Sequence, residues 1–156
     1  MNEVDEQVMR LLRCERKEAP APWYITIFPT NRCNLRCGIC WQRRFDHLHD
    51  DIPDERLLRL VDECAALDVR GWCIAGGGEP MTRPDVVLAM CERIRGHGMD
   101  GTLVTNGVAF KTSYFERLAD CRWSDIAVSL DGPTEDINDA IRSNGDRKST
   151  RLNSSH

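Results

Sequence analysis

The hydrophobic positions of this chain follow two alternating patterns. Four short, nearly continuous apolar runs predict β-strands, at residues 23–29, 71–76, 101–106 and 125–130. Between and after these runs, apolar residues recur every three or four positions, which predicts helices near residues 53–65, 82–96, 113–121 and 134–141. An amphipathic, mixed-charge segment precedes the first strand, and we expect a helical lead-in at residues 1–21.

Local signals mark the ends of two of these helices. Thr82 and Asp85 bracket Pro84 as at the capped start of the second helix, and Gly96 and Gly98 suit its end. Ser113 and Glu116 are spaced as a capping box, which predicts that Ser113 caps the third helix.

Unusual polar motifs follow all four predicted strands. A cysteine cluster follows the first strand, and the later strands are followed by GGGEP at residues 76–80, TNG at residues 105–107 and SLDG at residues 129–132. Alternating strands and helices predict parallel strands joined by right-handed crossovers, so that all strand carboxyl ends share one edge. Because such sheets place their chemistry at that edge, we expect the four motifs to form one site.

Composition narrows the possible partners and the compartment. The 156 residues are 41% hydrophobic and 29% charged, with a formal net charge of -4, so nothing predicts binding to nucleic acid or to an anionic membrane. No apolar run approaches the length of a membrane span, and the amino terminus lacks the features of a secretory signal. We therefore expect a cytoplasmic protein without membrane association.

Three of the eight cysteines form a cluster. In a reducing compartment we expect no disulfide framework, and five scattered cysteines are expected to pack as small hydrophobic residues: Cys14, Cys64, Cys73, Cys91 and Cys121. Cys33, Cys37 and Cys40 instead have the spacing C-x3-C-x2-C, which lets one tight loop wrap an iron–sulfur cluster. Three thiolates would leave one iron of a [4Fe-4S] cluster open to oxygen and nitrogen donors of another molecule.

Two other interpretations of this cluster stay open at this point. The three thiols together with His47 or His49 would form a Cys3His zinc site, which is typical of a small interaction module. CGIC at residues 37–40, directly after a strand, is also similar to the active site of a thiol oxidoreductase. Cys33 and the GGGEP motif would have no role in that redox chemistry.

Taken together, the motifs resemble those of the radical S-adenosylmethionine (SAM) superfamily. CNLRCGIC at residues 33–40 is similar to its three-cysteine signature, and GGGEP stands after the next strand, where the family has a Gly-Gly-Glu motif. TNG and SLDG fall where many members have similar sequences. The resemblance covers residues 22–145 and implies an α/β fold, a partial parallel (β/α) barrel of radical SAM type, truncated after about four β/α units.

The resemblance also implies how two cofactors would be held. Three irons of a [4Fe-4S] cluster would be ligated by Cys33, Cys37 and Cys40, and the amino and carboxylate groups of SAM would chelate the fourth iron. Ile39 would lie against the adenine of SAM.

Polar groups of the other motifs would complete the SAM site. The turn that contains Gly77, Gly78 and Glu79 would receive the SAM amino group, because glycines allow a close backbone approach and Glu79 offers a carboxylate. Polar contacts to the ribose or carboxylate of SAM would come from Asn106, Ser129 and Asp131. A capping role at the strand ends is an equally open interpretation of Asn106 and Ser129.

The implied activity is reductive cleavage of SAM to a 5′-deoxyadenosyl radical, which abstracts a hydrogen atom from a substrate. Such an enzyme needs a low-potential electron donor such as a flavodoxin or a ferredoxin. Residues 129–145 are similar to the branch of the family that often carries C-terminal auxiliary-cluster domains and includes peptide-maturing enzymes. The substrate, a small molecule or a peptide, is not specified by the sequence.

We expect three segments along the chain. A helical lead-in at residues 1–21 precedes an incomplete radical SAM core at residues 22–145 and a non-native tail at residues 146–156. The tail, DRKSTRLNSSH, can be encoded by a common short-read sequencing adapter. Because the family barrel usually has more β/α units than the four predicted here, we expect the fragment itself to be inactive.

Overall fold

The computed structural model describes residues 3–18, 21–44 and 51–142, and its centre is a single parallel sheet. Its strands lie in the order in which they occur along the chain: β1 (Tyr24–Ile27), β2 (Gly71–Ile74), β3 (Asp100–Thr105) and β4 (Asp125–Val128). All four predicted strands are therefore confirmed, as is the α/β class with parallel strands. The tail predicted at residues 146–156 lies outside the described residues.

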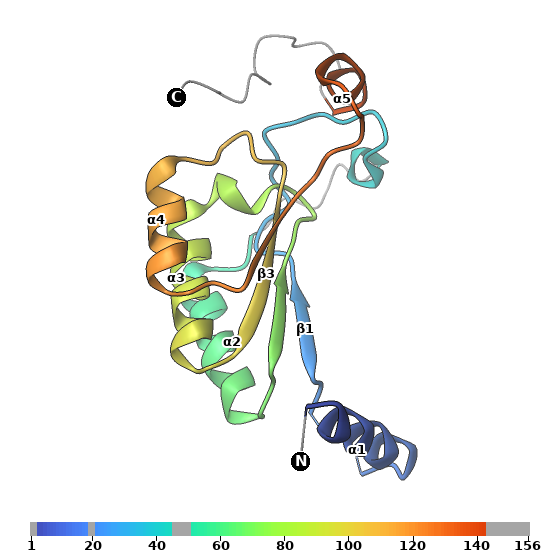
Figure 1. Cartoon of the computed structure of the whole chain (residues 1–156), viewed down its shortest axis with the longest axis vertical. Coiled ribbons are helices and arrows are strands. Elements are labelled where there is room, and N and C mark those ends of the chain that lie inside the picture. The colour runs from blue at the N-terminus through green and yellow to red at the C-terminus, as the bar shows by residue number, and fades with distance from the viewer. Residues whose placement is uncertain (1–2, 19–20, 45–50, 143–156) are drawn as a thin grey trace.

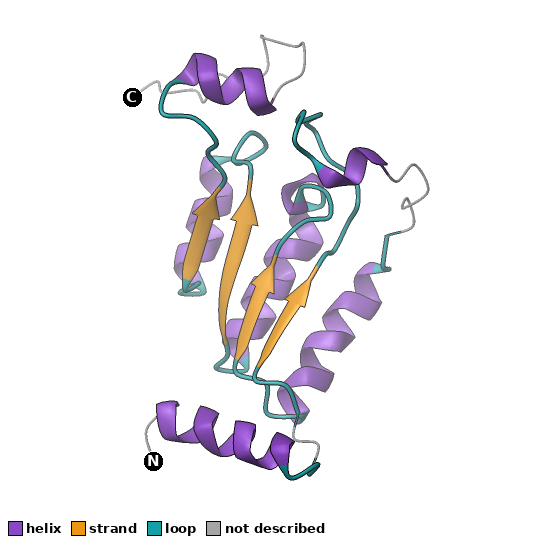
Figure 2. Ribbon diagram, turned by 90° about the vertical axis from the view of Figure 1, so that its right-hand side faces the viewer, coloured by secondary structure: helices purple, strands orange, loops and turns teal. Residues whose placement is uncertain are grey.

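Helices cover one face of this sheet and both of its ends (Figures 1 and 2). The layer on the face consists of α2 (Asp54–Ala66), α3 (Pro84–Gly96) and α4 (Thr112–Asp120). Figure 2 shows α1 (Glu3–Glu15) beneath the amino ends of the strands and α5 (Glu135–Arg142) above their carboxyl ends. Two short 3-10 helices, η1 (Trp41–Arg44) and η2 (Pro80–Thr82), lie in the connections.

Strand register gives the two faces of the sheet different chemistry. One row of register partners belongs to or packs on the hydrophobic core beneath the helices: Ile27, Ile74, Leu103 and Ile126. The row one residue earlier points to the opposite face, because side chains alternate along a strand: Thr26, Cys73, Thr102 and Asp125. No described helix covers that second face (Figure 2), as expected of part of a barrel wall.

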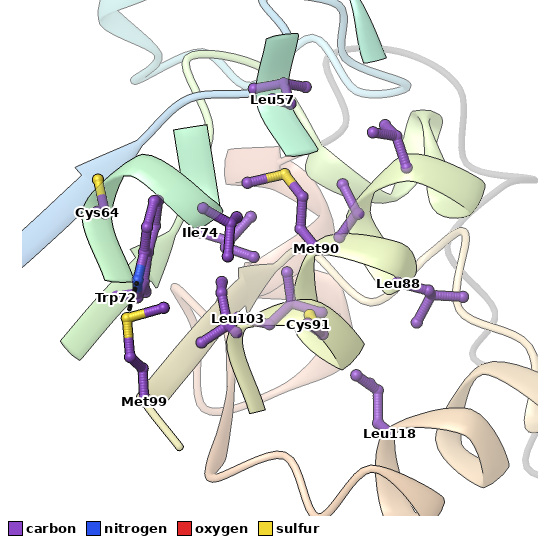
Figure 3. Packing of buried hydrophobic residues seen from close by; sticks show 14 of the residues in the cluster. Leu57, Cys64, Trp72, Ile74, Leu88, Met90, Cys91, Met99, Leu103 and Leu118 are labelled. Atoms are coloured by element: carbon purple, nitrogen blue, oxygen red, sulfur yellow. Dashed lines mark hydrogen bonds between the residues drawn. The ribbon is translucent and has the colours of Figure 1, made fainter. Parts of the chain in front are cut away.

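The core lies between β2, β3 and the helix layer (Figure 3). Trp72 is fully buried, and its indole Nε1 donates a hydrogen bond to Met99 Sδ at 3.3 Å, so its single polar group has a partner. Around Ile74 and Leu103, the labelled side chains of α2 and α3 converge on the sheet: Leu57, Met90 and Cys91. Because Ile74 and Leu103 are fully buried beneath these helices, the carboxyl ends of β2 and β3, which carry the site, are held in place.

Helix ends confirm one sequence signal and correct two others. Gly96 is the last residue of α3, and Gly98 has a positive φ of 74°. Pro84 is the first residue of α3, but the residue before it is Arg83 rather than Thr82, and no side chain caps this helix start. The capping box predicted at Ser113 is wrong, because α4 begins after Lys111 and has no side-chain cap. Phe110 packs against Phe115 instead, with ring centroids 4.5 Å apart, so a hydrophobic staple sets the start of α4.

The lead-in helix α1 is held by its polar side. Arg10 donates to the Asp68 carboxylate at 2.5 Å and to the Asp68 carbonyl at 2.8 Å. Its guanidinium also lies 4.9 Å from the centre of the Trp23 ring, just before β1. Within the described part of the chain, no helix combines the length and apolar character that a membrane span requires.

The exposed contact between α2 and α3 generates a pH prediction. Asp62 accepts hydrogen bonds from Arg93 Nε and Nη2, each at 2.7 Å, and lies 2.8 Å from His97 Nε2. These hydrogen bonds, from Arg93 first and then His97, lower the pKa of Asp62 to about 2. Because this folded-state pKa is depressed, the stabilisation is present above about pH 4 and is lost as the pH falls toward about 2.

We therefore predict that Asp62→Asn lowers the urea midpoint of unfolding at about pH 6, and that this difference shrinks between about pH 4 and about pH 2. The control is Glu116→Gln, an exposed position on α4. A difference for Asp62→Asn that stays constant across this pH range would contradict the prediction.

Candidate functional site

The four sequence motifs meet at the carboxyl edge of the sheet, as predicted (Figure 2). The cysteine loop, defined as residues 30–40, follows β1, and the glycine turn, residues 76–80, follows β2. Asn106 is the residue after β3, and residues 129–132 follow β4. Parallel topology alone brings these positions to one edge.

Main-chain hydrogen bonds join the glycine turn to the cysteine loop. Gly78 N donates to the Thr30 carbonyl at 2.9 Å, and Glu79 N donates to the Arg32 carbonyl at 2.8 Å. A Cβ atom on Gly78 would lie 1.9 Å from the Arg32 carbonyl oxygen, and one on Gly77 would lie 2.2 Å from Asn31 Oδ1. Gly78 is therefore required by contact with the backbone of the cysteine loop, whereas the close neighbour of Gly77 is a side chain that can move.

The Glu79 side chain lies beneath the site and is only 3% exposed. Its Oε1 accepts from Met81 N at 3.0 Å and from the Thr105 hydroxyl at 2.6 Å. Its Oε2 accepts from Asn106 N at 2.7 Å. This carboxylate thus caps η2 and ties the glycine turn to the end of β3, which uses most of its acceptor capacity.

Asn106 connects β3 to the cysteine loop. Its Nδ2 donates to Asn34 Oδ1 at 2.8 Å, and its Oδ1 accepts from Val108 N at 3.0 Å. Ser129 is half-buried, and its N–H donates to the Thr105 carbonyl at 2.9 Å, so it extends the pairing of β3 and β4. The structure therefore brings Asn106 into contact with the cysteine loop, whereas the described bond of Ser129 is to β3.

The three cysteines of the loop are free thiols. Cys33 Sγ accepts a hydrogen bond from Leu35 N at 3.4 Å, and Cys40 N donates to the Cys37 carbonyl at 3.2 Å, which closes a turn. Burial is the main cause of a raised pKa at Cys33, and negative charge on Glu79 and the other two thiols adds to it. Burial also raises the pKa of Cys37. Bound cations would reverse this preference for neutral thiols.

Three cysteine thiols on one short loop are a donor set of the kind that holds an iron–sulfur cluster. Within the described residues, no group of three or more His, Cys, Asp or Glu side chains is arranged to hold a single metal ion. In a [4Fe-4S] cluster each thiolate binds a different iron, so the sulfur atoms stand farther apart than they do around one zinc ion. His47 and His49, proposed as zinc ligands, lie outside the described residues.

Helix α5 lies next to the cysteine loop (Figure 1). Gly38 N donates to the Ile141 carbonyl at 3.0 Å, and the Arg142 guanidinium pairs with Asp131 at 2.7 Å. Burial raises the pKa of the Cys37 thiol, and the positive charge of Arg142 is the strongest opposing influence. The predicted site residue Asp131 is thus engaged by α5, while Ile39 remains 69% exposed on the loop.

Sequence reasoning missed three residues of this site: Thr105, Asn34 and Arg142. Thr105 and Asn34 stood inside motifs that had been identified, so their polar side chains were a usable signal. Arg142 had no comparable signal, because its place beside Cys37 depends on how α5 packs on the loop.

Comparison with known proteins matches the site to one family. The sequence pattern of the Radical SAM superfamily matches residues 27–153. Mycofactocin maturase MftC of Mycobacterium tuberculosis is 31% identical over 138 residues, which cover 88% of this chain and 35% of the relative. PqqA peptide cyclase of Methylorubrum populi is 31% identical over 116 residues, which cover 72% of this chain and 29% of the relative. The chain thus spans about a third of the length of these relatives.

Solved structures share the fold. Streptococcus suis SuiB bound to precursor peptide SuiA matches with a TM-score of 0.69 at 22% identity, over 91% of this chain and 33% of SuiB. SuiB has also been solved bound to S-adenosylmethionine, with a TM-score of 0.67. The family's cofactors are a [4Fe-4S] cluster and SAM, so the two expected cofactors are confirmed at the level of the family. The chain belongs to the radical SAM superfamily.

Proposed function

We propose that this chain provides the cluster-binding and SAM-binding part of a radical SAM enzyme that modifies a peptide. The observation that carries the proposal is the pair of main-chain hydrogen bonds that join the cysteine loop to the glycine turn. A peptide substrate is supported by the names of its relatives, a maturase and a peptide cyclase, and by the precursor peptide bound to SuiB. When bound, the two cofactors supply radical chemistry that removes a hydrogen atom from the substrate.

In this proposal Cys33, Cys37 and Cys40 hold the cluster. All three belong to one loop, and none is in a disulfide. The N–H of Leu35 that donates to Cys33 Sγ is the kind of hydrogen bond that tunes the reduction potential of a cluster. Ile39, exposed between two of the cysteines, offers an apolar surface to the adenine of SAM.

The SAM amino group would be received by the main chain of the glycine turn. The carboxylate of Glu79 already accepts three hydrogen bonds from the protein, so we assign it to tying the glycine turn to the end of β3. Asn106 and Ser129 would offer polar groups to the ribose.

A charged pair formed by the last residue of α5 and the segment after β4 would complete the SAM site. Asp131 and Arg142 form an ion pair there, with side chains 29% and 15% exposed. Arg142 would attract the SAM carboxylate by charge, and Asp131 would keep that guanidinium oriented.

The remaining partners follow from the cofactors. A low-potential donor such as a flavodoxin or ferredoxin would reduce the cluster, and a reducing cytoplasm would keep the thiols free. A small-molecule substrate is the alternative to a peptide.

The first experiment is anaerobic reconstitution with iron and sulfide, followed by metal analysis and visible spectroscopy before and after SAM is added. We expect about four irons per chain and a brown cluster whose spectrum changes with SAM. Stoichiometric zinc, or a folded chain that takes up no metal, would overturn the proposal.

Replacing one loop cysteine should remove the cluster. We predict that Cys37→Ala lowers the iron and sulfide content of the reconstituted chain at least about tenfold, because one iron loses its thiolate. Cys14→Ala, which removes an exposed thiol from α1, is the matched control and should bind iron as the wild type does. Equal iron content in the two variants would contradict the assigned ligands.

The glycine turn generates a second prediction. Gly78→Ala should displace the turn from Arg32 and weaken SAM binding about tenfold or more, measured by titrating the cluster spectrum with SAM. Gly96→Ala at the end of α3 is the matched control, because a Cβ atom there meets nothing within 4 Å. Wild-type SAM affinity in Gly78→Ala would show that the turn tolerates a side chain.

A further inference from the structure

The two ends of the cysteine-containing connection between β1 and α2 meet in a buried polar contact. Thr30 at its start donates from Oγ1 to Asp51 Oδ1 at 2.7 Å, across 21 positions of sequence. Thr30 is 2% exposed, and the Asp51 side chain is 7% exposed. A neutral hydroxyl alone would not compensate for burial of a carboxylate, so further partners are required.

Arg83 supplies one of these partners from the residue between η2 and α3. Its guanidinium donates to the Pro29 carbonyl, just before the loop, and to the Ile52 carbonyl at 2.9 Å, just after Asp51. The same group pairs with Asp54 and lies 3.9 Å from Asp51 Oδ2. The planar Arg83 guanidinium, which has several N–H donors, therefore contacts both ends of the connection. A lysine ammonium would not reproduce this arrangement.

Arg32 connects this contact to the glycine turn. Arg32 Nη2 pairs with Asp51 Oδ2 at 2.6 Å, and Arg32 N donates to the Thr30 hydroxyl at 3.0 Å. The carbonyl of the same residue accepts from Glu79 N. Burial would raise the pKa of Asp51, but the Thr30 hydrogen bond and the charges of Arg32 and Arg83 outweigh it and lower that pKa.

We infer that Thr30, Asp51 and Arg83 form a latch that positions the cysteine loop against the glycine turn. These are positioning residues, and their role in SAM binding rests on the proposed function above. The latch acts through the Thr30 and Arg32 carbonyls, which accept hydrogen bonds from the Gly78 and Glu79 amides. Loss of the latch would leave the sheet and the helix layer intact while loosening the two bonds that join the loops.

The first test measures amide hydrogen exchange in the metal-free chain and so does not depend on the proposed function. We expect Arg83→Lys to speed exchange at the Gly78 and Glu79 amides about tenfold, with no change at the buried β3 amides. Arg93→Lys is the matched control, because Arg93 is also paired with an aspartate but is exposed and remote from the loop. Equal exchange at Gly78 in both variants, or uniformly faster exchange throughout Arg83→Lys, would overturn the latch.

The second test uses the reconstituted chain and a conservative rescue. Thr30→Val removes the hydroxyl with little change of shape, whereas Thr30→Ser keeps it, and this pair carries the inference if Arg83→Lys does not fold. We expect Thr30→Val to raise the dissociation constant for SAM about tenfold and to release iron to a chelator about tenfold faster, with Thr30→Ser near the wild type. Equal values for the two variants would overturn the latch, whereas a wild-type chain that takes up no iron would overturn the proposed function alone.

Discussion

Close contact between two backbones is the constraint on which the site depends. The glycine turn approaches the start of the cysteine loop so closely that a Cβ atom on Gly78 would lie 1.9 Å from the Arg32 carbonyl oxygen, far inside van der Waals contact. The absence of a side chain at Gly78 permits the two main-chain hydrogen bonds that the Gly78 and Glu79 amides donate to the cysteine loop. The carboxyl ends of β1 and β2 carry these segments, and the β1–β2 pairing fixes their separation.

Glu79 extends this constraint to the third strand. A buried carboxylate is costly unless donors surround it, and here the donors come from η2, from Thr105 and from the amide of Asn106. The Asn106 side chain then donates a hydrogen bond to Asn34 of the cysteine loop, so that the contacts form a ring around the strand ends. The acidic residue of the GGGEP motif thus acts in this structure as the central acceptor of the framework.

Periodicity predicted the fold more completely than it predicted the site. Alternation of short apolar runs and helical stretches identified all four strands, because parallel strands buried against helices need continuous apolar sequence. The start of α4 was misplaced, because the Phe110–Phe115 contact outweighed a capping signal. Arg83 and Asp51 escaped notice for another reason: their partners are mostly main-chain carbonyls and distant side chains, which leave no spacing pattern in the sequence.

The second face of the sheet sets a requirement on whatever covers it. Thr26, Thr102 and Asp125 lie in one row of that face. The neighbouring row, from Ile27 to Ile126, points to the helix layer and is wholly apolar. A dry, hydrocarbon-like cover would strand the Asp125 carboxylate without donors. An interior bounded by this face would therefore have to hold water or a polar group of another molecule beside Asp125.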